Sequence, residues 1–217
     1  AKVLFKELST KVNQLDLENS AYNIDKVLLA GADIRADLYL PAKKEDPKKV
    51  QKISAGSGKE KAMKVLLGNL NFNDVKVVYN NTAVVPSKQG MDYNHLNFSR
   101  MNVDIRNFKM ENNEFAGTVK SAEIKESKGL DIQRLTTNFT YGSKEAYLKN
   151  LYLQTPKTIL RDEVVIGYDS VEQLTANPGA IKVSASIRDS KVGFSDILNL
   201  VPALRNTVPF NKYPNAV

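Results

Sequence analysis

The residue types that most often carry out chemistry in proteins are scarce in this chain. Its 217 residues include no cysteine and a single histidine, His95. The lack of cysteine excludes a disulfide framework, a thiol nucleophile and every Cys-ligated zinc or iron–sulfur site. A metal site built from several histidines is excluded as well, and Ser-His-Asp catalysis would have to use His95.

His95 lies in the segment Asp92–Leu96, between a turn-like stretch and the start of a strand. A catalytic base needs a positioned partner within hydrogen-bond reach. No residue type or spacing in the sequence singles out such a partner. We therefore interpret His95 as a structural histidine at the entry to a strand.

Phosphate-binding and carboxylate chemistry have no sequence signature either. The pair Gly58-Lys59 would need a glycine in place of Ile53 and a hydroxyl residue in place of Glu60 to form a phosphate-cradling loop. Aspartates and glutamates are scattered over outward strand faces and loops, and no spacing selects a catalytic pair. We predict that the chain is not an enzyme and that it has no cofactor and no metal site.

The net charge of +7 is concentrated in one run, residues 41–61, where seven lysines stand against three acidic residues. This run has no aromatic residue on which a nucleic-acid base could stack. We predict a solvated, mobile loop that is dispensable for folding, and no nucleic-acid partner. The alternative, a contact with the phosphates of lipid headgroups or nucleic acid, rests on charge alone.

The elements that would position any site are strands. Over 27–40 every second residue from Leu28 onward is apolar, and charged residues stand between them. This period of two is typical of a half-buried strand with one apolar and one polar face. Short polar turns separate the segments, which favours antiparallel neighbours and an all-β fold of roughly nine or ten strands. Similar apolar patterns recur at 70–79, 101–110, 115–124, 135–141, 147–155, 160–168 and 181–187.

Two local signals interrupt this pattern. The apolar series that runs to Ile105 resumes at Phe108, one residue out of phase, which predicts a β-bulge. Ser195-Asp196 is an N-cap signal, and the apolar residues that follow it before Pro202 predict one short C-terminal helix.

The N-terminal segment fits a strand or a helix about equally well, and an internal repeat favours the strand. Phe5–Tyr22 aligns without gaps on Phe98–Phe115, at an offset of 93 residues, with coinciding apolar positions and three identities. Because the chain opens on Ala1 in the middle of a patterned segment, we expect an internal piece of a longer repeat protein. Residues 1–217 would then form a single β-rich domain.

Four segments between Leu66 and Pro202 carry a resemblance to a known family. Their order and their pattern of apolar and polar residues resemble the strand repeats of TamB/AsmA-like envelope proteins, in the large form typical of Bacteroidetes. None of the four is a catalytic signature. They are NLNFNDVKVVYNN at Asn69–Asn81, DYNHLNFSRMNVDI at Asp92–Ile105, a strand pair at Leu135–Pro156, and DSKVGFSDILNLVP at Asp189–Pro202.

The resemblance implies a long antiparallel sheet curled into a U-shaped trough, the β-taco, with an apolar concave face. It implies a periplasmic protein whose full-length form is anchored to the inner membrane by a helix that we expect outside this segment. It also implies a role in moving phospholipid towards the outer membrane, or in helping outer-membrane proteins to assemble.

On this hypothesis the concave face binds the acyl chains of a phospholipid or another lipid, which requires apolar surface but no particular residue. The alternative is a structural module, a closed β-sandwich or scaffold, that contacts an outer-membrane assembly protein and binds no ligand. An open sheet would also be expected to self-associate through its edges. The candidate groove residues are apolar members of the alternating strands: Ile34, Leu38, Phe72, Val103, Ile105, Leu135, Phe139, Leu153, Ile166, Val183 and Ile187.

Overall fold

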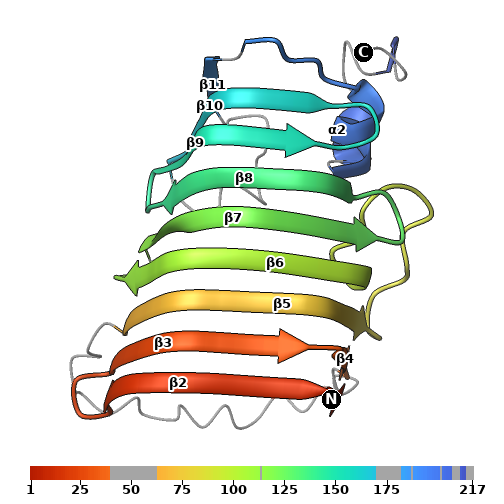
Figure 1. Cartoon of the computed structure of the whole chain (residues 1–217). Coiled ribbons are helices and arrows are strands. Elements are labelled where there is room, and N and C mark those ends of the chain that lie inside the picture. The colour runs from red at the N-terminus through yellow and green to blue at the C-terminus, as the bar shows by residue number, and fades with distance from the viewer. Residues whose placement is uncertain are drawn as a thin grey trace, which may run out of the picture.

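The fold was obtained as a computed structural model, which describes residues 1–39, 63–112, 114–169, 182–186, 188–200, 202–206 and 211–213. The described part is a single open, curled sheet with one short helix at its C-terminal end (Figure 1). This confirms the all-β fold predicted from the alternation. The strands are β1 (Lys2–Leu4), β2 (Glu7–Asp16), β3 (Ala21–Ala30), β4 (Asp33–Leu38), β5 (Lys64–Asn81), β6 (His95–Glu111), β7 (Glu114–Glu126), β8 (Asp131–Tyr141), β9 (Glu145–Gln154), β10 (Ile159–Gly167) and β11 (Lys182–Ser186).

From β5 to β11 the strands follow one another in chain order, and each pairs antiparallel with the next. At the other edge β3 and β4 both pair with the long strand β5, and this pairing is parallel. The outermost strands β2 and β1 then pair antiparallel with β3 and β4. The sheet is therefore antiparallel except at one position, a pairing that the short turns did not predict.

The parallel pairing has a consequence for the chain between β4 and β5. Leu38 pairs with Asn81 at the C-terminal end of β5, whereas β5 begins at Lys64. The connection must therefore return along the full length of β5. The Lys-rich run 41–61, predicted to be a mobile loop, belongs to this connection and lies outside the described residues.

The strand predicted over 27–40 is broken at Gly31, which has a left-handed backbone with φ of 56°. The conformation favours glycine, and a Cβ at this position would also come within 2.6 Å of the Lys6 side chain, which would have to move. The break moves the apolar side chains from one alternation phase to the other. Leu29, and not Leu28, shares a sheet face with Phe72, because the register pairs these two residues.

β-Bulges correct the phase of the alternation in the same way along other strands. Asn107 has φ of 52°, and the β6–β7 register shifts beside it, which confirms the bulge predicted before Phe108. Asp74 and Asn150 adopt the same left-handed conformation in β5 and β9. Aspartate and asparagine tolerate this conformation better than most residues. Each bulge shifts the alternation by one residue. Apolar residues three positions apart, such as Ile105 and Phe108, therefore still lie on the same face of the sheet.

The N-terminal segment is a strand, as the internal repeat predicted. The repeat aligns two antiparallel hairpins, β2–β3 and β6–β7. Their turns each contain a residue of positive φ, Ser20 in the first and Asn112 in the second.

The predicted C-terminal helix is present as α2 (Phe194–Leu200) and is followed by the 3₁₀ helix η2 (Pro202–Asn206). The predicted N-cap was wrong, because α2 begins at Phe194 and both Ser195 and Asp196 lie inside it. Among the described residues, no helix is both long and apolar enough to cross a membrane.

Candidate functional site

Two rows of mostly apolar side chains cross the sheet on one side, and we call this side the apolar face. Residues that pair directly across strands share a face, so the register identifies the members of each row. The first row consists of Leu8, Leu29, Phe72, Val103, Ala122, Leu135, Leu153 and Leu160. The second consists of Leu15, Tyr22, Val65, Met110, Phe115, Tyr141, Ala146, Ile166 and Val183.

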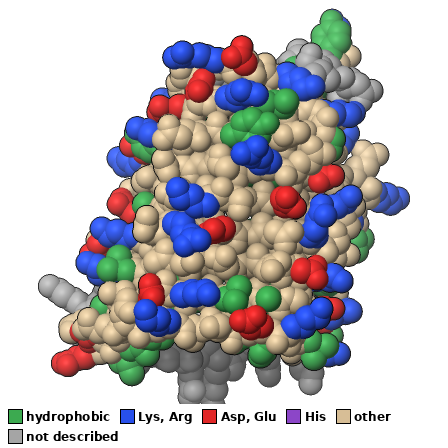
Figure 2. All heavy atoms as spheres, in the orientation of Figure 1, with side chains coloured by type: hydrophobic (Ala, Val, Ile, Leu, Met, Phe, Trp, Pro, Cys, Tyr) green, Lys and Arg blue, Asp and Glu red, His purple; other side chains and the backbone are tan. Residues whose placement is uncertain are grey.

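The opposite side, the polar face, carries rows of a different composition. One such row consists of Lys26, Asn69, Arg106, Thr118, Asn138 and Lys149. Figure 2 shows one side of the sheet, where charged and other polar groups outnumber hydrophobic side chains.

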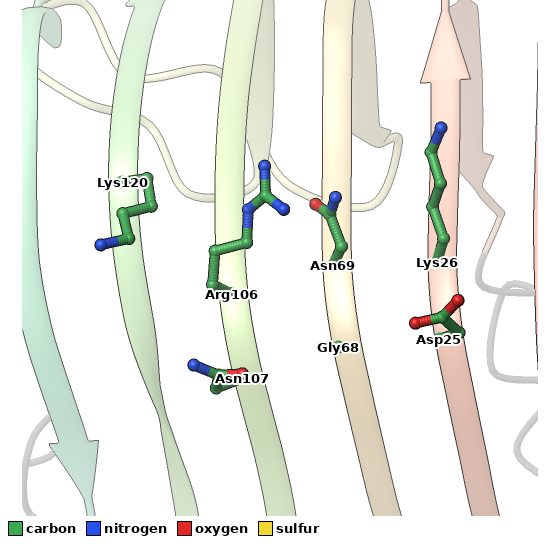
Figure 3. Close-up of a pocket in the computed structure, with 7 residues that line it drawn as sticks. All are labelled: Asp25, Lys26, Gly68, Asn69, Arg106, Asn107 and Lys120. Carbon is green, nitrogen blue, oxygen red and sulfur yellow. The ribbon is translucent and has the colours of Figure 1, made fainter.

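A hollow of about 690 Å³ lies on the polar face where the bulge of β6 meets Gly68 of β5 (Figure 3). Arg106 lines this hollow, and its guanidinium group donates to the Asp104 carboxylate at 2.7 and 2.9 Å. Asp25 also lines it, and its carboxylate lies 2.8 Å from the Lys11 ammonium. Two of the four charged side chains that line the hollow are thus paired within the chain.

The structure places the predicted groove residues as follows. The first row contains Phe72, Val103, Leu135 and Leu153, and the second contains Ile166 and Val183. The register pairs Ile105 with Leu70 and Val119, Phe139 with Gly117 and Leu148, Ile34 with Val77, and Leu38 with Asn81. Ile187 lies outside the described residues.

None of the ten described candidates is fully buried. Leu38 is 41% and Val183 65% exposed, and the other eight are half-buried. In a closed sandwich the inner faces of two sheets bury each other, and such residues would form the core. The described strands instead form one sheet. The closed sandwich, which the sequence left open as an alternative, is therefore wrong.

Aromatic rings gather on the apolar face over β6, β7 and β8. The ring centroids of Phe108 and Phe115 are 6.2 Å apart, and those of Phe115 and Tyr141 are 5.6 Å apart. Phe139 extends this cluster from Phe108 at 6.4 Å, and Tyr168 extends it from Tyr141 at 6.0 Å. These spacings are those of favourable tilted ring pairs. The cluster gives the middle of the face a continuous aromatic surface.

An apolar cavity of about 290 Å³ lies where α2 packs over the apolar face of β9, β10 and β11. This volume is close to the lower limit of ~300–1,000 Å³ for small-molecule pockets. The sequence did not predict the cavity, because neither the helix nor the strands reveal alone that they face each other. Its apolar lining includes Leu153, Leu160, Val164, Val183, Ile197 and Leu200.

Polar contacts at both ends of α2 fix it over this cavity. The Thr158 hydroxyl donates to the Asp196 carboxylate at 2.7 Å, and the Thr155 hydroxyl donates to the same oxygen. At the C-terminal end the Tyr93 hydroxyl donates to the Leu200 carbonyl at 2.7 Å. Between them Leu198 is only 1% exposed. The helix is therefore anchored to the sheet rather than free in solution.

A buried polar cluster surrounds Asp92, in the loop before β6. Its carboxylate accepts hydrogen bonds from the backbone N–H groups of Ser87 at 2.6 Å and Asn94 at 3.1 Å. It also lies 3.0 Å from His95 Nδ1 and 3.4 Å from the Lys128 ammonium. Burial alone would raise the pKa of Asp92, but these hydrogen bonds outweigh it and lower the pKa to about 2.

No partner of His95 could be singled out from the sequence, and in the structure its Nδ1 contacts the Asp92 carboxylate. The spacing of three residues was the available signal. Because Asp92 also binds two backbone groups of the adjoining loop, the pair organises the turn into β6. In the described part of the chain, no group of three or more His, Cys, Asp or Glu side chains is placed to hold a metal ion.

Compared with protein-family models, curated proteins and solved structures, the chain matches none of them.

Proposed function

We propose that this chain binds the acyl chains of phospholipids on its apolar face and takes part in moving them through the bacterial envelope. The observation that carries the proposal is the pair of apolar rows across one open sheet, with residues that remain partly exposed. Such a surface leaves apolar area in water unless a ligand or partner covers it.

The energetics of acyl-chain burial favour this occupant. Each buried methylene contributes ~0.8 kcal/mol, so a sixteen-carbon chain offers on the order of 10 kcal/mol before entropy costs. The interaction is non-directional, and it needs no catalytic or charged group. The cavity below α2 adds a more enclosed apolar site at the β9–β11 end of the same face.

The resemblance to TamB/AsmA-like proteins supplies the proposed setting. In that setting the protein is periplasmic, its full-length form is held at the inner membrane, and the apolar face supports outer-membrane lipid transport. A second candidate is a scaffold that contacts an outer-membrane assembly protein. It is favoured by the exposed apolar side chains of β2, where Leu8 is 55% and Leu15 is 56% exposed.

A binding titration with a fluorescent polyene fatty acid tests the proposal. Phe139 and Asn138 are adjacent in β8, and Asn138 belongs to the polar face, where Thr118 donates to it at 2.8 Å. We expect saturable binding to the wild type and to Asn138→Glu, and loss of binding in Phe139→Glu. Circular dichroism would verify that both variants remain folded.

The absence of saturable binding to the wild-type chain would contradict lipid binding and favour the scaffold. Equal loss of binding in the two variants would show that charge, and not the apolar face, controls the interaction.

A further inference from the structure

Two edge strands on opposite sides of the sheet, β2 and β11, both expose apolar side chains that belong to the same row. Leu15 of β2 is 56% exposed and begins the second row, and Val183 of β11 is 65% exposed and ends it. In the described part of the chain, β2 pairs on one side only, with β3, and β11 pairs on one side only, with β10. Both edges therefore offer backbone groups and apolar surface to a further strand.

The directions of these strands are compatible with direct pairing. β3 runs parallel to β5, and β2 runs antiparallel to β3. Each of the six steps from β5 to β11 reverses the direction, so β11 runs parallel to β5. A second copy placed edge to edge, with its apolar face on the same side, would thus bring β11 antiparallel to β2.

The register of the second row determines which residues would meet. Continuing this row from one copy to the next places Val183 opposite Leu15, so two exposed apolar side chains cover each other. In an antiparallel pair, Lys182 then stands opposite Asp16, and Ser184 stands opposite Gln14. An opposite-charge pair directly across two strands favours pairing.

We propose that copies of this chain join through β11 of one copy and β2 of the next, with Val183 on Leu15 and Lys182 opposite Asp16. The two strands are different surfaces, so each added copy brings one further β2 edge or β11 edge to which another copy can join. The apolar face then continues from copy to copy. This inference rests on the strand edges and their register, and it holds whether or not the face binds lipid.

Disulfide trapping tests the register directly, because the chain has no cysteine of its own. Leu15→Cys and Val183→Cys would be purified separately, mixed and mildly oxidised. Opposed residues of antiparallel strands bring their Cβ atoms to ~4.5–5.5 Å, near the ~3.5–4.5 Å that a disulfide needs. We expect a crosslinked species containing one copy of each variant. As the control, Leu15→Cys would be mixed with Val85→Cys, which is 87% exposed and lies between β5 and β6.

Crosslinking of Leu15→Cys only with itself would overturn the proposal in favour of a β2–β2 contact. Equal crosslinking with Val85→Cys would overturn it in favour of random collision. Failure of the mixed pair to crosslink would overturn it as well.

Light scattering of the unmodified chain provides a second test. We expect the mean mass to rise with concentration, and we expect Leu15→Lys to lose this rise, because a lysine on an edge strand opposes pairing. Leu17→Lys is the matched control, since Leu17 is 75% exposed but lies in the turn after β2, and it should still associate. A wild-type chain that stays monomeric would overturn the proposal without bearing on lipid binding.

Discussion

The ring of Phe139 lies over Gly117 of the neighbouring strand, so closely that a Cβ at Gly117 would come 3.0 Å from the Phe139 Cζ. The same Cβ would come 3.4 Å from the Phe108 Cα. β7 thus presents bare backbone in the middle of the aromatic cluster, and the space is filled by the ring of the adjacent strand.

This relationship predicts the effect of a larger side chain at Gly117. Gly117→Val should lower the free energy of unfolding by about 1–3 kcal/mol, because the Phe139 ring must shift to make room for the added side chain. Gly167→Val is the control, since the nearest atom to a Cβ there lies at 3.8 Å. Urea denaturation would measure both. Equal destabilisation by the two substitutions would show that the space over Gly117 is not needed by the ring.

The Asp92 cluster predicts a pH dependence of stability. The pKa of Asp92 is lowered to about 2 in the folded chain, so its ionised form is favoured by folding. Its contribution is present above pH 4 and is lost as the pH falls towards 2. Asp92→Asn should cost about 1–3 kcal/mol at pH 7. The difference between wild type and variant should shrink from pH 4 to pH 2.

Urea titrations at a series of pH values would measure this difference, which isolates Asp92 from the other carboxylates. A difference that stays constant down to pH 2 would contradict the role of the ionised carboxylate.

The attachment of α2 depends on the buried hydroxyl of Thr158, which donates to Asp196 and accepts from the Gly193 N–H. Thr158→Val keeps the shape but leaves the Gly193 N–H without its acceptor and the Asp196 carboxylate with the Thr155 hydroxyl alone, so we expect a loss of about 1–3 kcal/mol. Hydrogen exchange of the α2 amides should accelerate at the same time. Thr118→Val, which removes a hydroxyl from the polar face, should leave α2 unaffected. Unchanged exchange in Thr158→Val would show that other contacts suffice to hold the helix.

Because β4 pairs parallel with β5, the connection between them must reach from the C-terminal end of β5 back to its start. We predict that the fold requires the length of this Lys-rich connection. The connection must return past eighteen residues of β5, about 55 Å at ~3.3 Å per residue. Deleting 43–59 would leave eight residues between β4 and β5, which reach only ~30 Å. The deletion should therefore disrupt the β3–β4 edge, against our expectation from composition that the run is dispensable.

A Gly/Ser segment of equal length in place of 43–59 is the matched control. It should preserve the thermal midpoint, because only the span is required. A deletion variant as stable as the wild type would mean that β3 and β4 do not pair with β5 as the structure has them.

The alternation of residue types was enough to predict the strands and the bulge before Phe108, because a period of two reports which side chains share a face. It does not report which strand is the neighbour. The parallel pairing of β3 and β4 with β5 therefore could not be predicted, since it depends on a connection that carries no apolar pattern.

The candidate site was predictable to a similar degree. Phe72, Val103, Leu135 and Leu153 could each be recognised in the sequence as an apolar member of an alternating strand, but their common row depends on the register of five strands. Leu28 lies on the polar side although it shares the sequence alternation of Ile34, because the left-handed residue Gly31 between them reverses the phase. The Asp92–His95 pair was missed because it depends on the fold of a loop, where periodicity gives no information.

The central claim, that lipid occupies the apolar face, is tested most directly by photocrosslinking. A benzophenone amino acid would be placed at Phe139 in one variant and at Asn138 in the other. Each protein would be irradiated with vesicles of phosphatidylethanolamine and phosphatidylglycerol, and the products would be identified by mass spectrometry. The two positions are consecutive in β8 and belong to opposite faces of the sheet, so they differ in face and not in location.

We predict a phospholipid adduct at position 139 and none at position 138. No adduct at position 139, or equal adducts at the two positions, would contradict lipid binding on the apolar face.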